Sequence, residues 1–121
     1  MKVLVTGSAG FIGNAVSLKL LDEGYEVIGV DNLNPYYDVR LKKNRIERLN
    51  PYENFINAQI DINDQSELDK IFKDHRINKI IHLAAQAGVR HSLKAPKDYI
   101  DVNISGFLNI LELARKYEIS H

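Results

Sequence analysis

The sequence predicts an α/β protein built on a doubly wound parallel sheet. Short apolar runs alternate along the 121 residues with segments whose apolar side chains recur every three or four positions. Strands that alternate with helices are typical of a parallel sheet with right-handed crossovers and helices on both faces. A glycine-rich loop follows the first strand, at the edge where open sheets of this kind bind ligands. The length predicts one domain.

In the first unit, residues 2–6 form a short buried strand and residues 11–21 form the helix that follows the glycine loop. Gly24 ends this helix. The positions predicted to share one face of the helix are Phe11, Ala15, Leu18 and Leu21.

The second and third units repeat this order. Residues 26–30 form a strand, and residues 38–49 form a basic helix. The charged side chains of residues 40–48 are expected to form a solvated face; contact with phosphates is the alternative. Residues 54–60 form the third strand. Asp64 begins a sequence that resembles a capping box and predicts the start of the third helix.

The fourth unit consists of a strand over residues 79–84, a loop over 85–94 and a long helix over 96–117. Pro96 suits the first turn of that helix. The usual strand order, 3-2-1-4, leaves the fourth strand at an edge of the sheet. We therefore expect about four βα units, truncated before a fifth strand that would begin near residue 119.

The composition excludes several classes of protein. The 16 Lys and Arg residues balance 16 Asp and Glu residues, which disfavours a nucleic-acid or membrane-surface partner that binds through bulk charge. No apolar run approaches the roughly 20 residues of a membrane span. The absence of cysteine excludes disulfides and cysteine-based zinc sites. We expect a cytoplasmic protein without a metal site.

The glycine loop and Asp31 predict a dinucleotide site. Gly7, Gly10 and Gly13 fit a tight turn, a close approach of a pyrophosphate and a close packing of helix on strand. Asp31 ends the second strand, where a carboxylate can accept both hydroxyls of an adenosine ribose. It would also repel a 2′-phosphate and so favours NAD over NADP. The alternatives are a tight turn without a ligand and an aspartate that caps its own loop.

Four motifs together resemble the extended short-chain dehydrogenase/reductase family of NAD-dependent epimerases and dehydratases, which has a Rossmann-type fold. The motifs are Thr6-Gly7-x-x-Gly10-Phe11-Ile12-Gly13, Asp31-Asn32-Leu33, Asp61-Ile62 and His82-Leu83-Ala84-Ala85. Within that family, residues 31–42 and 84–93 are similar to the UDP-glucuronate 4-epimerases.

The resemblance implies a cofactor role for each matching residue. The pyrophosphate would lie on Gly7, Gly10, Phe11, Ile12 and Gly13. The adenosine would contact Asp31, Asn32, Leu33, Asp61 and Ile62. The nicotinamide side of the groove would be formed by Leu83, Ala84 and Ala85, with Ala87 near the sugar entrance and Asn103 supporting the groove.

Two further residues have alternative interpretations. His82 lies within an apolar strand, where a packed, hydrogen-bonded imidazole is favoured over a general base. Arg90 follows the fourth strand, where its guanidinium could bind the diphosphate or a sugar carboxylate of a substrate; a solvated surface arginine is the alternative.

The resemblance implies reversible oxidation at C4 of a nucleotide sugar, with a Tyr-x-x-x-Lys pair for proton transfer. None of the six tyrosines is followed by lysine four positions later, so we predict no catalytic residue here. Residues 1–121 are thus expected to be a partial N-terminal NAD-binding domain of an epimerase, without the C-terminal substrate domain. The alternatives are a 4,6-dehydratase or decarboxylase, and a stand-alone dinucleotide-binding module. A homodimer through the helix 96–117 is also expected from the resemblance.

Overall fold

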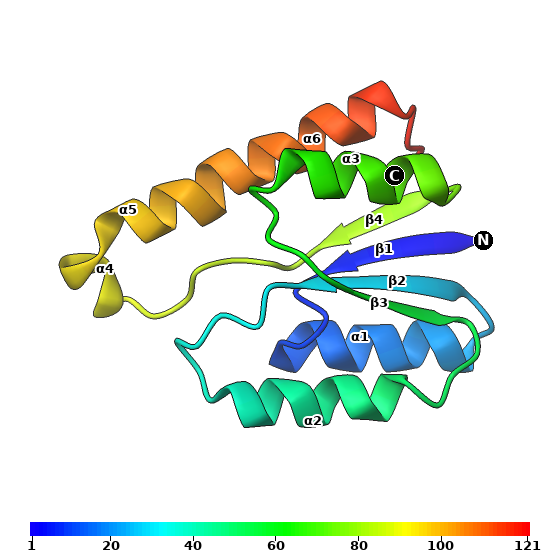
Figure 1. Cartoon of the computed structure of the whole chain (residues 1–121), viewed down its shortest axis with the longest axis horizontal. Helices are drawn as coiled ribbons and strands as arrows, with labels where there is room; N and C mark the ends of the chain where they lie inside the picture. Colours follow the sequence, from blue (N-terminus) through cyan, green and yellow to red (C-terminus); the bar gives the residue numbers. More distant parts are fainter.

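The computed structural model describes residues 1–121, and a single four-stranded parallel sheet lies at its centre (Figure 1). The strands are β1 (Lys2–Thr6), β2 (Glu26–Asp31), β3 (Phe55–Gln59) and β4 (Lys79–His82). Their order is β3-β2-β1-β4, so the predicted order is confirmed. The register pairs Val3 with both Val27 and Lys79, which aligns the carboxyl ends of the strands at one edge.

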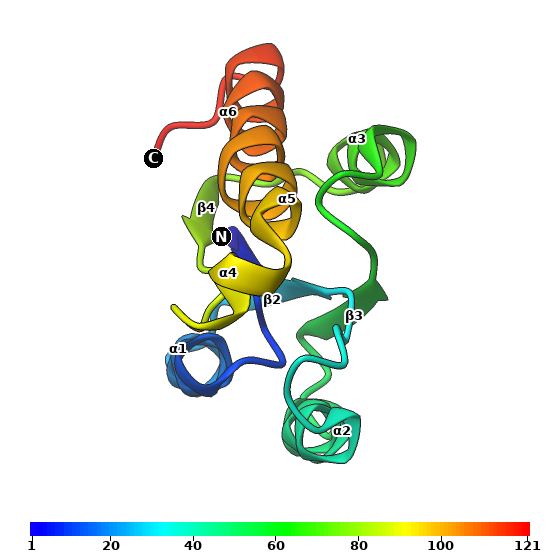
Figure 2. The ribbon, with the colours of Figure 1, turned by 90° about the vertical axis from the view of Figure 1, so that its left-hand side faces the viewer.

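Helices cover both faces of the sheet. The helices α1 (Phe11–Asp22) and α2 (Val39–Leu49) lie on one face, and α3 (Gln65–Asp74) lies with α6 (Phe107–Lys116) on the other (Figures 1 and 2). Each face has its own apolar core because side chains alternate along the strands. One core contains Val3, Val5, Val27, Leu21, Ile46 and Leu49; the other contains Leu4, Ile28, Val30, Leu68, Phe72, Ile110 and Leu113.

The helix predicted over residues 96–117 is present but has three parts. These are α5 (Pro96–Tyr99), a π-helical segment η1 (Ile100–Gly106) and α6, which ends one residue before the predicted end. Apolar periodicity cannot distinguish a π turn from an α turn inside a continuous helix. A short helix α4 (His91–Lys94) also interrupts the predicted loop 85–94.

The predicted inner face of α1 is confirmed at Leu21, which is buried, and at Leu18, which is partly buried against the core, but it is wrong at Phe11 and Ala15, which are exposed. The buried residues are Gly13, Asn14, Ser17 and Leu21, whereas Phe11 is 81% exposed. The reason is a close approach of the helix to the first strand. A Cβ on Gly13 would lie 2.0 Å from the Gly7 carbonyl oxygen, so small residues must face the sheet there. The large apolar side chains are displaced to the flanks.

The last residues of the chain lie beside β4. The Ile80 amide donates to the His121 carbonyl oxygen at 2.9 Å, and the Ser120 amide donates to the Asn78 carbonyl oxygen at 3.3 Å. This pairing matches the position expected for the beginning of a fifth strand.

None of the helices has both the length and the apolar character that a membrane crossing requires.

Candidate functional site

A cavity of about 610 Å³ lies along the carboxyl edge of the sheet. Volumes of this order are typical of small-molecule and cofactor sites. Its walls come from the loop after β1, the end of β2, the segment after β3, the segment after β4 and one side of α2. The predicted site residues that line it are Gly7, Gly10, Phe11, Ile12, Gly13, Asp31, Asn32, Asp61, Ile62, Leu83, Ala84, Ala85 and Ala87.

The glycine loop forms a floor without side chains. Gly7 has φ of +75°, and a Cβ there would lie 2.9 Å from the Ala84 nitrogen. A Cβ on Gly10 would meet only the Gly7 carbonyl oxygen, at 3.0 Å, so this position is otherwise open. The loop leads directly into α1, whose first amides lack helical partners. The floor therefore fits a pyrophosphate, which needs close backbone approach and amide donors.

The Asp31 carboxylate is held in place by main-chain amides of the chain itself. Its side chain is only 8% exposed, and its two oxygens accept from the Ala9 amide at 3.1 Å and the Leu33 amide at 2.8 Å. A carboxylate has about four acceptor positions, so capacity for ribose hydroxyls remains. Leu33 does not line the cavity; its amide orients Asp31 instead. The alternative of a loop-capping Asp31 is thus part of the observed arrangement and is compatible with ribose binding.

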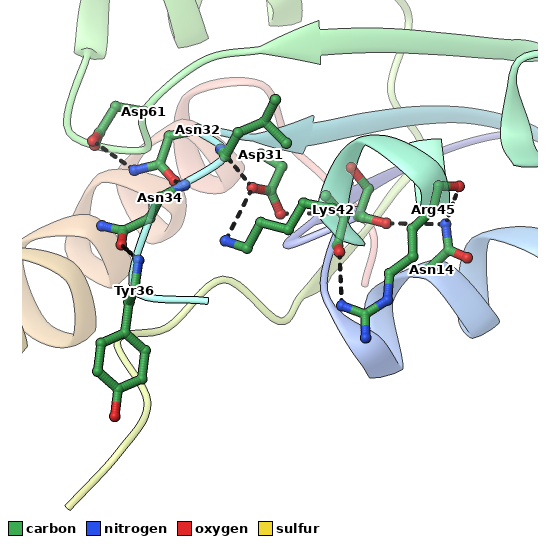
Figure 3. A network of polar contacts seen from close by, with 11 residues as sticks. Asn14, Asp31, Asn32, Asn34, Tyr36, Lys42, Arg45 and Asp61 are labelled. Atoms are coloured by element: carbon green, nitrogen blue, oxygen red, sulfur yellow. Dashed lines mark hydrogen bonds and ion pairs between the residues drawn. The ribbon is translucent and has the colours of Figure 1, made fainter. Parts of the chain in front are cut away.

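A chain of polar contacts continues from β2 toward β3 (Figure 3). The Asn32 side-chain nitrogen Nδ2 donates to the Asp61 carboxylate at 3.1 Å, and the Asn32 side-chain oxygen accepts from the Asn34 main-chain amide at 3.0 Å. Next to Asp61, Ile62 is 5% exposed. Its side chain occupies the space left by Gly106, where a Cβ would lie 2.4 Å from Ile62 Cδ1. The ends of β2 and β3 thereby form one wall that joins polar and apolar groups.

The basic helix contributes two residues that sequence reasoning missed. Lys42 and Arg45 line the cavity, whereas a solvated face was favoured for the basic segment over contact with phosphates. Arg45 Nη1 donates to the Ala9 carbonyl oxygen at 3.2 Å, and the Arg45 carbonyl oxygen accepts from Asn14 Nδ2 at 2.8 Å (Figure 3). The available signal was spacing: Lys42 and Arg45 are three positions apart and precede the buried Ile46.

The opposite wall follows β4 and is attached to β1 through Thr6. The Thr6 hydroxyl accepts from the Leu83 amide at 3.0 Å and the Ala84 amide at 3.1 Å. Its own proton is therefore donated to His82 Nδ1, 2.7 Å away, which makes that nitrogen an acceptor. Burial lowers the pKa of His82. The His82 ring stacks on the Phe107 ring, with 5.5 Å between the two ring centroids. The packed, hydrogen-bonded imidazole expected from the sequence agrees with these contacts.

Asn103 supports this wall without lining the cavity. Its side-chain oxygen accepts from the Gln86 amide at 2.8 Å, and its nitrogen donates to the Gln86 carbonyl oxygen at 3.2 Å. Asn103 lies in η1, the π-helical segment. π-helical turns often occur at functional sites.

Arg90 lies away from the cavity lining. It is exposed and precedes α4, and its side chain forms no hydrogen bond or ion pair with the rest of the chain. Its role in binding a substrate stays a prediction.

The fold and the position of the cavity define the class of protein: a Rossmann-type α/β protein whose site lies at the carboxyl edge of a parallel sheet. The model of the GDP-mannose 4,6-dehydratase family matches residues 4–121, so the chain belongs to this family.

Two relatives show what the sequence is similar to. It is 53% identical over 116 residues to a UDP-glucuronate 4-epimerase of Thermodesulfobacterium geofontis, covering 96% of this chain and 36% of that protein. It is 46% identical over 121 residues to the protein CapI of Staphylococcus aureus, covering 100% of this chain and 36% of that protein. The chain therefore spans about a third of the length of these relatives.

Two solved structures of UDP-sugar 4-epimerases are similar to this chain in fold and sequence. A mutant UDP-glucuronic acid 4-epimerase from Bacillus cereus, in complex with a fluorinated UDP-glucuronic acid and NAD, has a TM-score of 0.90 and 34% identity, covering 99% of this chain and 38% of that chain. UDP-glucose 4-epimerase from Thermotoga maritima, with UDP-glucose, has a TM-score of 0.84 and 39% identity, covering 98% of this chain and 35% of that chain.

Proposed function

We propose that this chain is the N-terminal, NAD-binding part of a nucleotide-sugar 4-epimerase that acts on UDP-glucuronate. The observation that carries the proposal is the buried Asp31 carboxylate beside a glycine floor in one cavity. The Bacillus cereus 4-epimerase in complex with NAD, which has the same fold, supports the cofactor. The Thermodesulfobacterium geofontis epimerase supports the substrate.

In this proposal the glycine loop holds the pyrophosphate against the amides at the start of α1. Asp31 accepts from the adenosine ribose, and Ile62 contacts the adenine ring. Leu83, Ala84, Ala85 and Ala87 form the nicotinamide side of the cavity, which Asn103 keeps in position through Gln86. Arg90 contacts the substrate.

NAD, when bound, supplies an acceptor that takes a hydride from the sugar and returns it. The residues of this chain bind and orient that cofactor. No tyrosine is followed by lysine four positions later, so we assign the proton-transfer residues of the epimerase to the parent protein outside residues 1–121.

A nucleotide-sugar 4,6-dehydratase is the second candidate, because the matching family model carries that description. It would share the initial oxidation at C4. Incubation of the parent protein with UDP-glucuronate and, separately, with a nucleotide hexose that carries a C6 hydroxyl separates the two: an epimerase yields an isomeric UDP-sugar of unchanged mass from UDP-glucuronate, whereas a 4,6-dehydratase yields from the hexose a product that has lost water.

The proposal includes a homodimer formed through the helix 96–117. Its outer surface carries five large apolar side chains that are 44–58% exposed. They are Ile100, Ile104, Phe107, Leu108 and Leu111. The cytoplasmic location and the lack of nucleic-acid and membrane partners stay predictions from composition.

Calorimetric titration of the chain with NAD tests the proposed function. We expect saturable binding of NAD by the unmutated chain. We expect at least about tenfold weaker binding by Asp31→Ala, since hydrogen bonds to a charged acceptor are lost. Asp31→Asn keeps the shape of the side chain and reports on charge alone. Asp74→Ala, an exposed aspartate at the end of α3, is the matched control. If the unmutated chain is folded but does not bind NAD, the proposal is contradicted.

A further inference from the structure

Lys42 is a mostly buried lysine beside the carboxylate of the proposed ribose site. Its side chain is only 11% exposed, and its Nζ lies 3.9 Å from Asp31 Oδ1 (Figure 3). Lysine is seldom buried to this degree without a close partner, because the ammonium loses its hydration. The Lys42 ammonium forms no hydrogen bond with the rest of the chain, so its donors remain available in the cavity that Lys42 lines.

The geometry around Asp31 explains why this ammonium is not a simple partner of the carboxylate. Asp31 already accepts from the Ala9 and Leu33 amides, which fix its orientation. At 3.9 Å, Lys42 is close enough for an electrostatic interaction but beyond hydrogen-bond distance. An acceptor and a donor of opposite charge therefore face the cavity side by side. A ribose hydroxyl, which both donates and accepts, matches such a pair.

We propose that Lys42 is a specificity-determining residue of the ribose site, acting together with Asp31; this inference rests on the proposed function. Asp31 accepts from the ribose hydroxyls while Lys42 donates to them. Discrimination against a 2′-phosphate then depends on the balance of two opposite charges. If the charge of Asp31 is removed, Lys42 becomes a binding group for the 2′-phosphate of NADP.

The test is a double-mutant cycle in which NAD and NADP binding to the chain are each measured by calorimetry. For Asp31→Asn we expect the ratio of NADP to NAD affinity to rise by about tenfold or more, the scale of one charge-assisted hydrogen bond. In Asp31→Asn combined with Lys42→Met, this rise is lost. Lys42→Met alone is expected to weaken NAD binding about fivefold.

Two further variants separate charge from folding. Lys42→Arg keeps the positive charge and is expected to keep the gain of NADP affinity in the Asp31→Asn background. Lys43→Met changes the adjacent, exposed lysine and is expected to leave both affinities within about twofold of the parent. Circular dichroism of each variant confirms that it is folded before its affinities are compared.

The outcomes distinguish the two proposals. Suppose that the unmutated chain binds NAD, but that Lys42→Met and Lys43→Met have the same NAD and NADP affinities, both alone and combined with Asp31→Asn. The Lys42 proposal is then overturned and the proposed function stands. If Asp31→Asn gains NADP affinity that persists without Lys42, the Lys42 proposal is also overturned. If the unmutated chain is folded but binds neither NAD nor NADP, the proposed function fails and the Lys42 proposal fails with it.

Discussion

The cavity surface formed by the glycine loop (the glycine wall) and the cavity wall along β4 (the β4 wall) are built in different ways. The glycine wall depends on main chain packed against main chain, with a Gly13 Cβ excluded by the Gly7 carbonyl oxygen at 2.0 Å. The β4 wall depends on side chains from distant elements, because Thr6 and Asn103 hold the amides of Leu83, Ala84 and Gln86. The first wall therefore has no room to adjust, whereas the second depends on a few hydrogen bonds. Substitutions in the two walls should differ accordingly.

The largest effect is expected for Gly13→Val in the glycine wall. The added side chain would collide with backbone rather than with a flexible side chain, so α1 must move away from the loop. We expect the free energy of unfolding to fall by about 3 kcal/mol or more, together with loss of NAD binding. Urea denaturation and calorimetry measure the two effects.

Gly24→Asn is the control for that substitution. Gly24, unlike the helical Gly13, has positive φ, of +85°, but a Cβ there would meet no atom within 4 Å, and asparagine tolerates this conformation. Its cost should stay at about 1 kcal/mol or less. An equal cost at positions 13 and 24 would mean that the close packing around Gly13 does not raise the cost of a side chain there.

A smaller effect is expected for Asn103→Leu in the β4 wall. The substitution removes both bonds to the Gln86 main chain and leaves a buried amide without a partner. We expect a loss of about 1–3 kcal/mol in the free energy of unfolding, and weaker NAD binding. Asn103→Asp retains the oxygen that accepts from the Gln86 amide and should recover part of the loss. Full stability of Asn103→Leu in urea would show that the wall does not need this contact.

The smallest effect is expected for the pH dependence that His82 causes. Burial lowers its pKa in the folded chain, so as the pH falls the unfolded chain binds this proton first. Its contribution to stability is therefore present above the ordinary imidazole pKa of about 6.5 and is lost as the pH falls below that value. Protonation of Nδ1 would also remove the acceptor for the Thr6 hydroxyl.

Urea denaturation of the parent chain and of His82→Gln, between about pH 8 and about pH 5, measures this contribution. The other three histidines titrate in both chains, so the difference between the two pH profiles isolates His82. The parent should lose more stability than the variant over this range. Parallel profiles would mean that the contact with Thr6 does not select the neutral ring.

The difference between the walls also explains which residues of the site could be predicted. Gly7, Gly10, Gly13 and Asp31 are local features of a strand, a turn and the next strand end, so their spacing was informative. The bond between Asn103 and Gln86 joins two elements, and only a family resemblance pointed to Asn103. Lys42 was not predicted because a basic helix is usually solvated, and its burial depends on how α2 packs beside Asp31.

The sequence by itself determined the alternation of strands and helices, the glycine turn and the carboxylate at the end of β2. These follow from apolar periodicity and from backbone conformations that few residues adopt. Only the tertiary structure decided that small residues of α1 face the sheet, that the helix 96–117 contains a π turn, and that Lys42 is buried beside Asp31. The physical reason is that each of these depends on the distance between elements remote in sequence, which no local pattern encodes.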